Sequence, residues 1–78
     1  MSWNYRVVRF DDAVEGEYLE IKEVYYDNDG GLMGYCDATV GAGSIEGIIE
    51  VLEMMKTDAH KAIIDEKEFH KVNKAEEV

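Results

Sequence analysis

The sequence contains no proline and only one cysteine, Cys36. A single cysteine cannot form a disulfide within the chain, which fits a reducing compartment. No apolar run approaches the roughly 20 residues that are needed to span a bilayer. Residues 1–6 lack the basic start and the apolar stretch of a secretory signal. We therefore expect a cytoplasmic protein.

Basic residues are also scarce. The chain has 8 Lys and Arg against 18 Asp and Glu, for a formal net charge of −10. Binding to nucleic-acid phosphates or to an anionic membrane needs clustered basic side chains, so the composition argues against both partners. The same charge permits docking onto a basic protein.

The chain has 78 residues, which is enough for one small domain. Its 46% hydrophobic content is too high for an intrinsically disordered chain. A core of this size supplies little net stability, and small domains gain more from a disulfide, a metal or a partner subunit. We expect one domain over residues 1–70 and a disordered tail over residues 71–78. A partner subunit is the remaining source of stability.

Three segments have the alternating pattern and the β-branched and aromatic content of strands, namely residues 3–10, 17–27 and 32–40. The Asp, Asn and paired Gly of residues 27–31 favour a hairpin between the last two. In the second strand the pattern slips near residues 23–24. Such a slip indicates either a β-bulge or a strand end with aromatic residues on both faces. In the third strand one face is small enough for a helix to pack closely, with Leu32, Gly34, Cys36, Ala38 and Val40.

A long helix is predicted over residues 44–60. Ser44 is a favourable N-cap residue, and Glu46 suits the positive end of the helix dipole. An apolar stripe then recurs at three- and four-residue steps, formed by Ile45, Ile48, Ile49, Leu52, Met55 and Ala59. The predicted fold class is therefore α+β, a three-stranded antiparallel sheet packed on one long helix. After the helix, residues 62–64 are expected to be extended, and Phe69 to anchor the start of a frayed acidic tail to the core.

No motif specifies a catalytic, cofactor-binding or metal-binding residue. The loop at residues 27–31 does not match the register of a calcium-binding loop. The glycines of residues 41–43 are followed by Glu46, where a dinucleotide-binding loop has its third glycine. His60 and His70 are ten residues apart, which is not a recurrent metal spacing. Cys36 lies within a strand pattern, so we predict a small core residue there and no nucleophile.

Aromatic residues form the candidate interaction face. One helix can cover only one face of a three-stranded sheet, and tyrosine offers a large rigid contact area with a polar tip. The alternative is an amphipathic face that stays in contact with water. The candidate residues are Trp3, Tyr5, Tyr18, Tyr25, Tyr26 and Tyr35.

The segments Trp-Asn-Tyr-Arg-Val at residues 3–7 and Glu-Val-Tyr-Tyr-Asp at residues 23–27 resemble a group of small conserved bacterial proteins of unknown function. The order strand–strand–strand–helix, with residues 41–46 entering the helix, also resembles the N-terminal module of HicB-type antitoxins. That resemblance implies a truncated ribonuclease-H-like fold, a small toxin partner and dimerisation. Fold alone does not assign function.

We therefore predict a non-catalytic protein-interaction or dimerisation module, HicB-antitoxin-like, without a cofactor. It is expected to form a homodimer or to bind a protein partner through the sheet edge or the tyrosine-bearing face. The alternative is a small carboxylate- or metal-dependent enzyme or ligand-binding protein, using carboxylates and His60.

Overall fold

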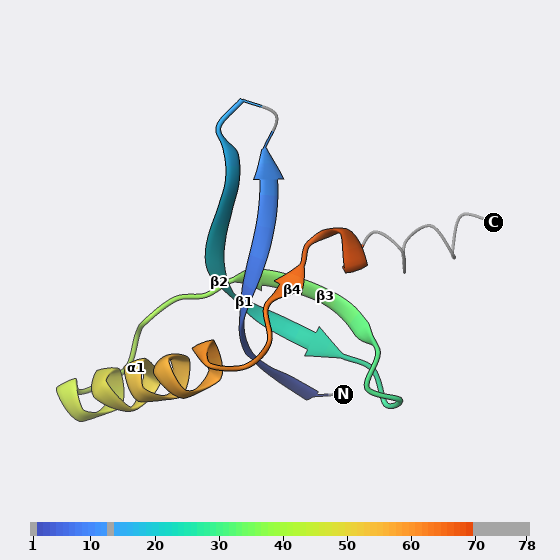
Figure 1. Ribbon diagram of the computed structural model, residues 1–78. Coiled ribbons are helices and arrows are strands. Elements are labelled where there is room, and N and C mark those ends of the chain that lie inside the picture. The colour runs from blue at the N-terminus through green and yellow to red at the C-terminus, as the bar shows by residue number, and fades with distance from the viewer. Residues whose placement is uncertain (1, 13, 70–78) are drawn as a thin grey trace.

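The computed structural model describes residues 2–12 and 14–69. Its elements follow the order β1 (Ser2–Asp12), β2 (Gly16–Tyr26), β3 (Leu32–Asp37), α1 (Ile45–Ala59) and β4 (Ile64–Asp65). The strands form one four-stranded sheet in the order β3-β2-β1-β4 (Figure 1). β1–β2 and β2–β3 are antiparallel, whereas β4 runs parallel to β1.

The α+β class and the three antiparallel strands are confirmed, but the prediction of a three-stranded sheet is incomplete. The missing strand is β4, which pairs Val8 with Ile64 and Arg9 with Asp65. Two residues are too few to produce a period-2 pattern, so β4 has no clear signal in the sequence. β3 ends at Asp37 and not at residue 40, and Thr39 and Val40 beyond it are exposed.

The helix boundaries are close to those predicted from the sequence. The Ser44 hydroxyl accepts a hydrogen bond from the Gly47 N–H at 3.1 Å, which satisfies one of the free donors of the first turn. α1 ends at Ala59 with His60 as its C-cap.

The turn between β2 and β3 is built on Asp27. Its Oδ1 accepts hydrogen bonds from the N–H groups of Asp29 at 2.9 Å and Gly31 at 2.8 Å. Gly30 has φ +82°, in the left-handed region where a side chain is strained. The predicted hairpin is therefore present, held by one carboxylate and one left-handed glycine.

Replacing Gly30 with alanine is expected to destabilise the fold by about 1–2 kcal/mol, because an L residue in the left-handed region is strained. Gly34→Ala is the matched control, since a Cβ at Gly34 meets nothing within 4 Å and its φ is not positive. Urea denaturation of both variants measures the difference. Equal losses of stability in the two variants would contradict the role of the turn.

The β-bulge does not lie near residues 23–24, where the alternating pattern of the sequence is interrupted. Pairing of β1 with β2 is continuous there, and the register shift lies between Tyr25 and Tyr26 in their pairing with β3. Tyr25 pairs with Gly34 and Tyr26 with Leu32, so Met33 is the extra residue. The bulge changes the phase of β3, and Leu32 joins the face of Tyr35 rather than that of Gly34. The predicted small face is therefore wrong.

The main core lies on the face of the sheet that carries Val8 and Val24, both of which are 0% exposed. Ile64 and Phe69, which follow α1 in the chain, complete this cluster. We call this side the core face. Partly buried side chains surround the cluster, namely Phe10, Tyr26, Leu32 and Tyr35. The expectation that Phe69 anchors the segment after the helix is confirmed, whereas residues 71–78 lie outside the described residues.

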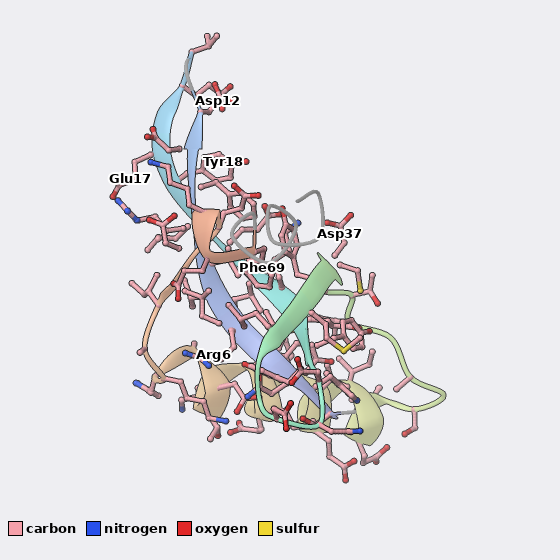
Figure 2. All side chains as sticks on the ribbon, turned by 90° about the vertical axis from the view of Figure 1, so that its right-hand side faces the viewer. Arg6, Asp12, Glu17, Tyr18, Asp37 and Phe69 are labelled. Atoms are coloured by element: carbon pink, nitrogen blue, oxygen red, sulfur yellow. The ribbon has the colours of Figure 1, made fainter. Side chains whose placement is uncertain are left out.

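α1 lies on the other side of the sheet, beside the N-terminal half of β1 (Figures 1 and 2). Tyr5 points away from the core face and is only 5% exposed. Its backbone N–H donates to Asp58 Oδ2 near the end of α1 at 3.2 Å. α1 thus lies against β1 on one side of the sheet, and the Phe69 turn lies against the core face.

Candidate interaction surface

The six predicted aromatic residues do not share one face. Trp3, Tyr5 and Tyr25 lie on the α1 side of the sheet, because they alternate with the core-face residues along paired strands. The core face carries the other three, Tyr18, Tyr26 and Tyr35. Only Trp3 at 47% and Tyr18 at 43% are among the exposed large hydrophobic residues.

The core-face tyrosines have partners within the fold. The Tyr35 ring meets Phe69 edge-on at 4.9 Å between centroids, and Tyr18 stacks on Phe10 at 5.3 Å. Tyr26 donates its hydroxyl hydrogen to Asn4 Oδ1 at 2.8 Å. These contacts give the three side chains structural roles.

A different apolar surface is open, on α1. Ile45 is 75% exposed, Ile49 52% and Leu52 49%. These three side chains lie within about 40° of Ile45 when the helix is viewed down its axis, at about 100° per residue. We call them the outer stripe. Met55, about 80° away on the same wheel, is the buried residue of α1.

Only part of the predicted apolar stripe of the helix is therefore buried within the monomer. The stripe was expected to pack on the sheet as a whole, yet α1 approaches chiefly β1. One strand offers a narrow surface, so the half-buried Ile48 and Val51 face it together with Met55. The other half of the apolar arc, the outer stripe, remains uncovered.

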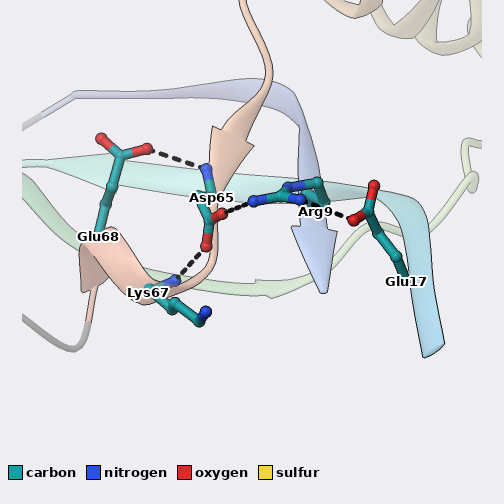
Figure 3. A network of polar contacts seen from close by, with 5 residues as sticks. All are labelled: Arg9, Glu17, Asp65, Lys67 and Glu68. Atoms are coloured by element: carbon teal, nitrogen blue, oxygen red, sulfur yellow. Dashed lines mark hydrogen bonds and ion pairs between the residues drawn. The ribbon is translucent and has the colours of Figure 1, made fainter. Parts of the chain in front are cut away.

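An ion-pair network joins the hairpin to the segment after α1 (Figure 3). The Arg9 guanidinium binds Glu17 Oε2 at 2.7 Å and also Asp65 Oδ2. The second oxygen of Asp65 accepts from the Lys67 N–H at 2.9 Å. These bonds, first the Lys67 N–H and then the Arg9 guanidinium, lower the pKa of Asp65 below its ordinary value. The network ties β1, β2 and β4 together.

The Asp65→Asn variant is expected to lose stability at neutral pH. Because the pKa of Asp65 is lowered in the folded state, its contribution is present above the ordinary carboxyl pKa of about 4. That contribution is lost as the pH falls through the lower folded value. Urea denaturation should show a difference between wild type and variant at pH 7 that shrinks at pH 3. Asp29→Asn, in the exposed turn, is the control, and a difference independent of pH would contradict this assignment.

Among the described residues, Lys22 is a charged side chain that is buried, at 7% exposure. Its ammonium group lies 2.5 Å from Asp37 Oδ1 and 3.4 Å from Glu20 Oε1. It also lies over the rings of Phe10 and Tyr35, at 5.6 and 5.8 Å from their centroids. The hydrogen bond to Asp37 raises the pKa of Lys22, so the amine stays protonated. A nucleophilic lysine needs the opposite shift.

Cys36 is exposed on β3, so the prediction of a core residue is wrong. Its Sγ lies 3.6 Å from both Glu23 Oε1 and the Tyr25 hydroxyl. The Tyr25 hydroxyl donates to Glu23 Oε1 at 2.8 Å, and its bonds with Cys36 and Glu23 raise the Tyr25 pKa. Reactive thiols lie beside cations or helix N-termini, whereas these contacts of Cys36 are with a carboxylate and a phenol.

The predicted absence of a metal motif can be compared with the described part of the chain. Within residues 2–12 and 14–69, no group of three or more His, Cys, Asp or Glu could hold a metal ion. His60 is exposed at the C-cap, and His70 lies outside the described residues. A shallow depression of about 300 Å³ is lined by four residues of α1 alone, Glu53, Met54, Thr57 and Asp58. Walls from one helix do not converge on a substrate as an active-site cleft does.

No protein-family model, curated protein or solved structure matches this chain. In the described residues, no helix is long and apolar enough to cross a membrane.

Proposed function

We propose that this protein is a non-catalytic interaction module, HicB-antitoxin-like in kind, that works by associating with a second copy or with a protein partner. The proposal rests on how many apolar side chains are exposed compared with how many are buried. Among the described residues, 6 hydrophobic side chains are buried and 11 large ones are exposed. The outer stripe supplies three members of this exposed set, and they lie on one side of α1.

Exposed apolar side chains are ordinary when they are scattered, but contiguous ones mark interaction sites. Along a helix, residues three and four positions apart are neighbours, so Ile45, Ile49 and Leu52 form a continuous ridge. Burying one such side chain fully is worth about 1.5–3 kcal/mol. A partner on this ridge therefore gains apolar burial that the sheet does not provide.

The order β1-β2-β3-α1 supports the HicB-like part of the proposal, since that family begins with three strands and a helix. The ion-pair network and the satisfied Lys22 support the non-catalytic part. Both engage their charged groups in structural contacts and leave no poised acid or base there.

Amide NMR spectra recorded at low and high protein concentration would test the proposal. We expect concentration-dependent shifts and broadening that cluster on exposed apolar residues, with the amides of Val8 and Val24 unchanged as internal controls. If the partner is another protein, adding native cell extract should shift the amides of the same exposed apolar residues. Spectra that superimpose at all concentrations and in native cell extract would contradict an interaction role.

A further inference from the structure

We infer that Met33 and Met54 are sites of oxidation to methionine sulfoxide by hydrogen peroxide, and that the fold accommodates the sulfoxide at both positions. Met55, the next residue of α1, is shielded from the oxidant and cannot carry a sulfoxide while α1 is packed on β1. This inference goes beyond the proposed function and does not depend on what covers the outer stripe.

Met33 is the extra residue of the β-bulge. Its neighbours Gly34 and Leu32 pair with β2, whereas Met33 has no partner residue in the β2–β3 register. The Met33 side chain is 51% exposed. A larger and more polar side chain at this position therefore displaces no strand pairing and no core contact.

Met54 lies on the open side of α1. Its side chain is 48% exposed and lines the shallow depression beside Glu53, Thr57 and Asp58. Three of the four residues around this depression are already polar, so a sulfoxide oxygen there stays in contact with water and polar groups. Met54 therefore meets the two conditions for a site that is oxidised without damage, which are access and a polar setting.

Met55 is in the opposite situation, although it is only one residue further along the helix. It is 9% exposed and is the buried residue of α1, on the side of the half-buried Ile48 and Val51. Burying a polar group without a hydrogen bond is unfavourable, so a sulfoxide at Met55 opposes the packing of α1 on β1. The same burial keeps peroxide away from the Met55 sulfur until α1 separates from β1.

The chemistry needs only the side chain and the oxidant. The thioether sulfur attacks one oxygen of hydrogen peroxide, the O–O bond breaks, and the second oxygen leaves as water. The sulfur loses two electrons and the peroxide gains them. The product is a polar sulfoxide that methionine sulfoxide reductases can reduce again, so the modification is reversible.

NMR of the full-length protein, isotopically labelled at its methionine methyl groups, tests the inference. Each thioether methyl signal is replaced by a sulfoxide signal as its sulfur reacts. The variants Met33→Leu, Met54→Leu and Met55→Leu assign the signals, because leucine keeps a similar side-chain volume. Cys36 has no methyl group, so its own reaction with peroxide does not enter the measurement. Met1 lies outside the described residues and is left out of the comparison.

In the native protein we expect Met33 and Met54 to react at least about tenfold faster than Met55, and in concentrated urea we expect all three rates to agree within about twofold. Circular dichroism should be unchanged when Met33 and Met54 alone have reacted. The helix signal should fall as Met55 reacts, because a helix of this length is marginal without its packing.

Three results would overturn the inference. Equal rates for Met54 and Met55 in the native protein would contradict the shielding of Met55. Slow reaction of Met33 and Met54 in the native protein would contradict their assignment as oxidation sites. Loss of the helix signal before Met55 reacts would contradict the claim that the fold accommodates the first two sulfoxides.

Discussion

Phe69→Ala is expected to lower the free energy of unfolding by about 3–5 kcal/mol, the usual range for removing a buried aromatic ring. Phe69 is 5% exposed, packs against Tyr35 and belongs to the cluster of Val8, Val24 and Ile64. At about 0.05–0.15 kcal/mol per residue, a domain of this length has only about 4–12 kcal/mol in total. The variant should therefore lose between about a quarter and all of the stability of the domain.

Urea denaturation followed by circular dichroism measures this loss. Phe69→Leu keeps an apolar side chain and should lose markedly less stability than Phe69→Ala. Val14→Ala is the control for an apolar truncation, since Val14 is 93% exposed. An unchanged denaturation midpoint in Phe69→Ala would show that the segment after β4 is not part of the core.

Ile49→Asp is expected to weaken association by a factor of at least about 100 while leaving the monomer folded. A molecule bound on the outer stripe would enclose the new carboxylate, and burying an unpaired charge is strongly unfavourable. Ile49 is 52% exposed in the monomer, so its loss removes little from the core.

Met54→Asp is a matched control for Ile49→Asp. Met54 is 48% exposed and lies on the same helix, but about 180° from Ile45 and so outside the outer stripe. Sedimentation velocity and circular dichroism on both variants separate loss of association from loss of folding. Equal effects of the two substitutions would contradict a role for the stripe.

Local signals in the sequence were sufficient to predict most of the fold. Ser44 predicts the start of the helix because a hydroxyl caps a first turn wherever the helix packs. The Asp and Gly residues of positions 27–31 predict the hairpin because the left-handed region is a property of the residue itself. Both features depend on few neighbours, and both are confirmed.

Features that depend on segments far apart in the sequence could not be predicted from local signals. β4 has two residues, and its pairing with β1 depends on where α1 returns the chain. The bulge at Met33 moves Leu32 to the opposite face from the one that alternation alone indicates. The helical period identified the apolar residues of α1, yet how many of them the sheet covers depends on how far α1 reaches across it.

The candidate surface changed for the same reason. Alternation placed tyrosines on both faces of the sheet, and the segment around Phe69 then engaged those of the core face. The exposed Ile45, Ile49 and Leu52 were predicted as core because their pattern is the same whether the covering surface is a sheet or a second subunit. The periodicity of a sequence indicates which side chains need to be buried. It does not indicate whether the same chain or a second molecule buries them.

The mass of the wild-type protein at sedimentation equilibrium tests the central claim most directly. With a chain mass of 8.9 kDa, association of two copies predicts a mass that rises toward 2 × 8.9 = 17.8 kDa as concentration increases from the low micromolar to the high micromolar range. A mass that stays at 8.9 kDa over that whole range would contradict association with a second copy.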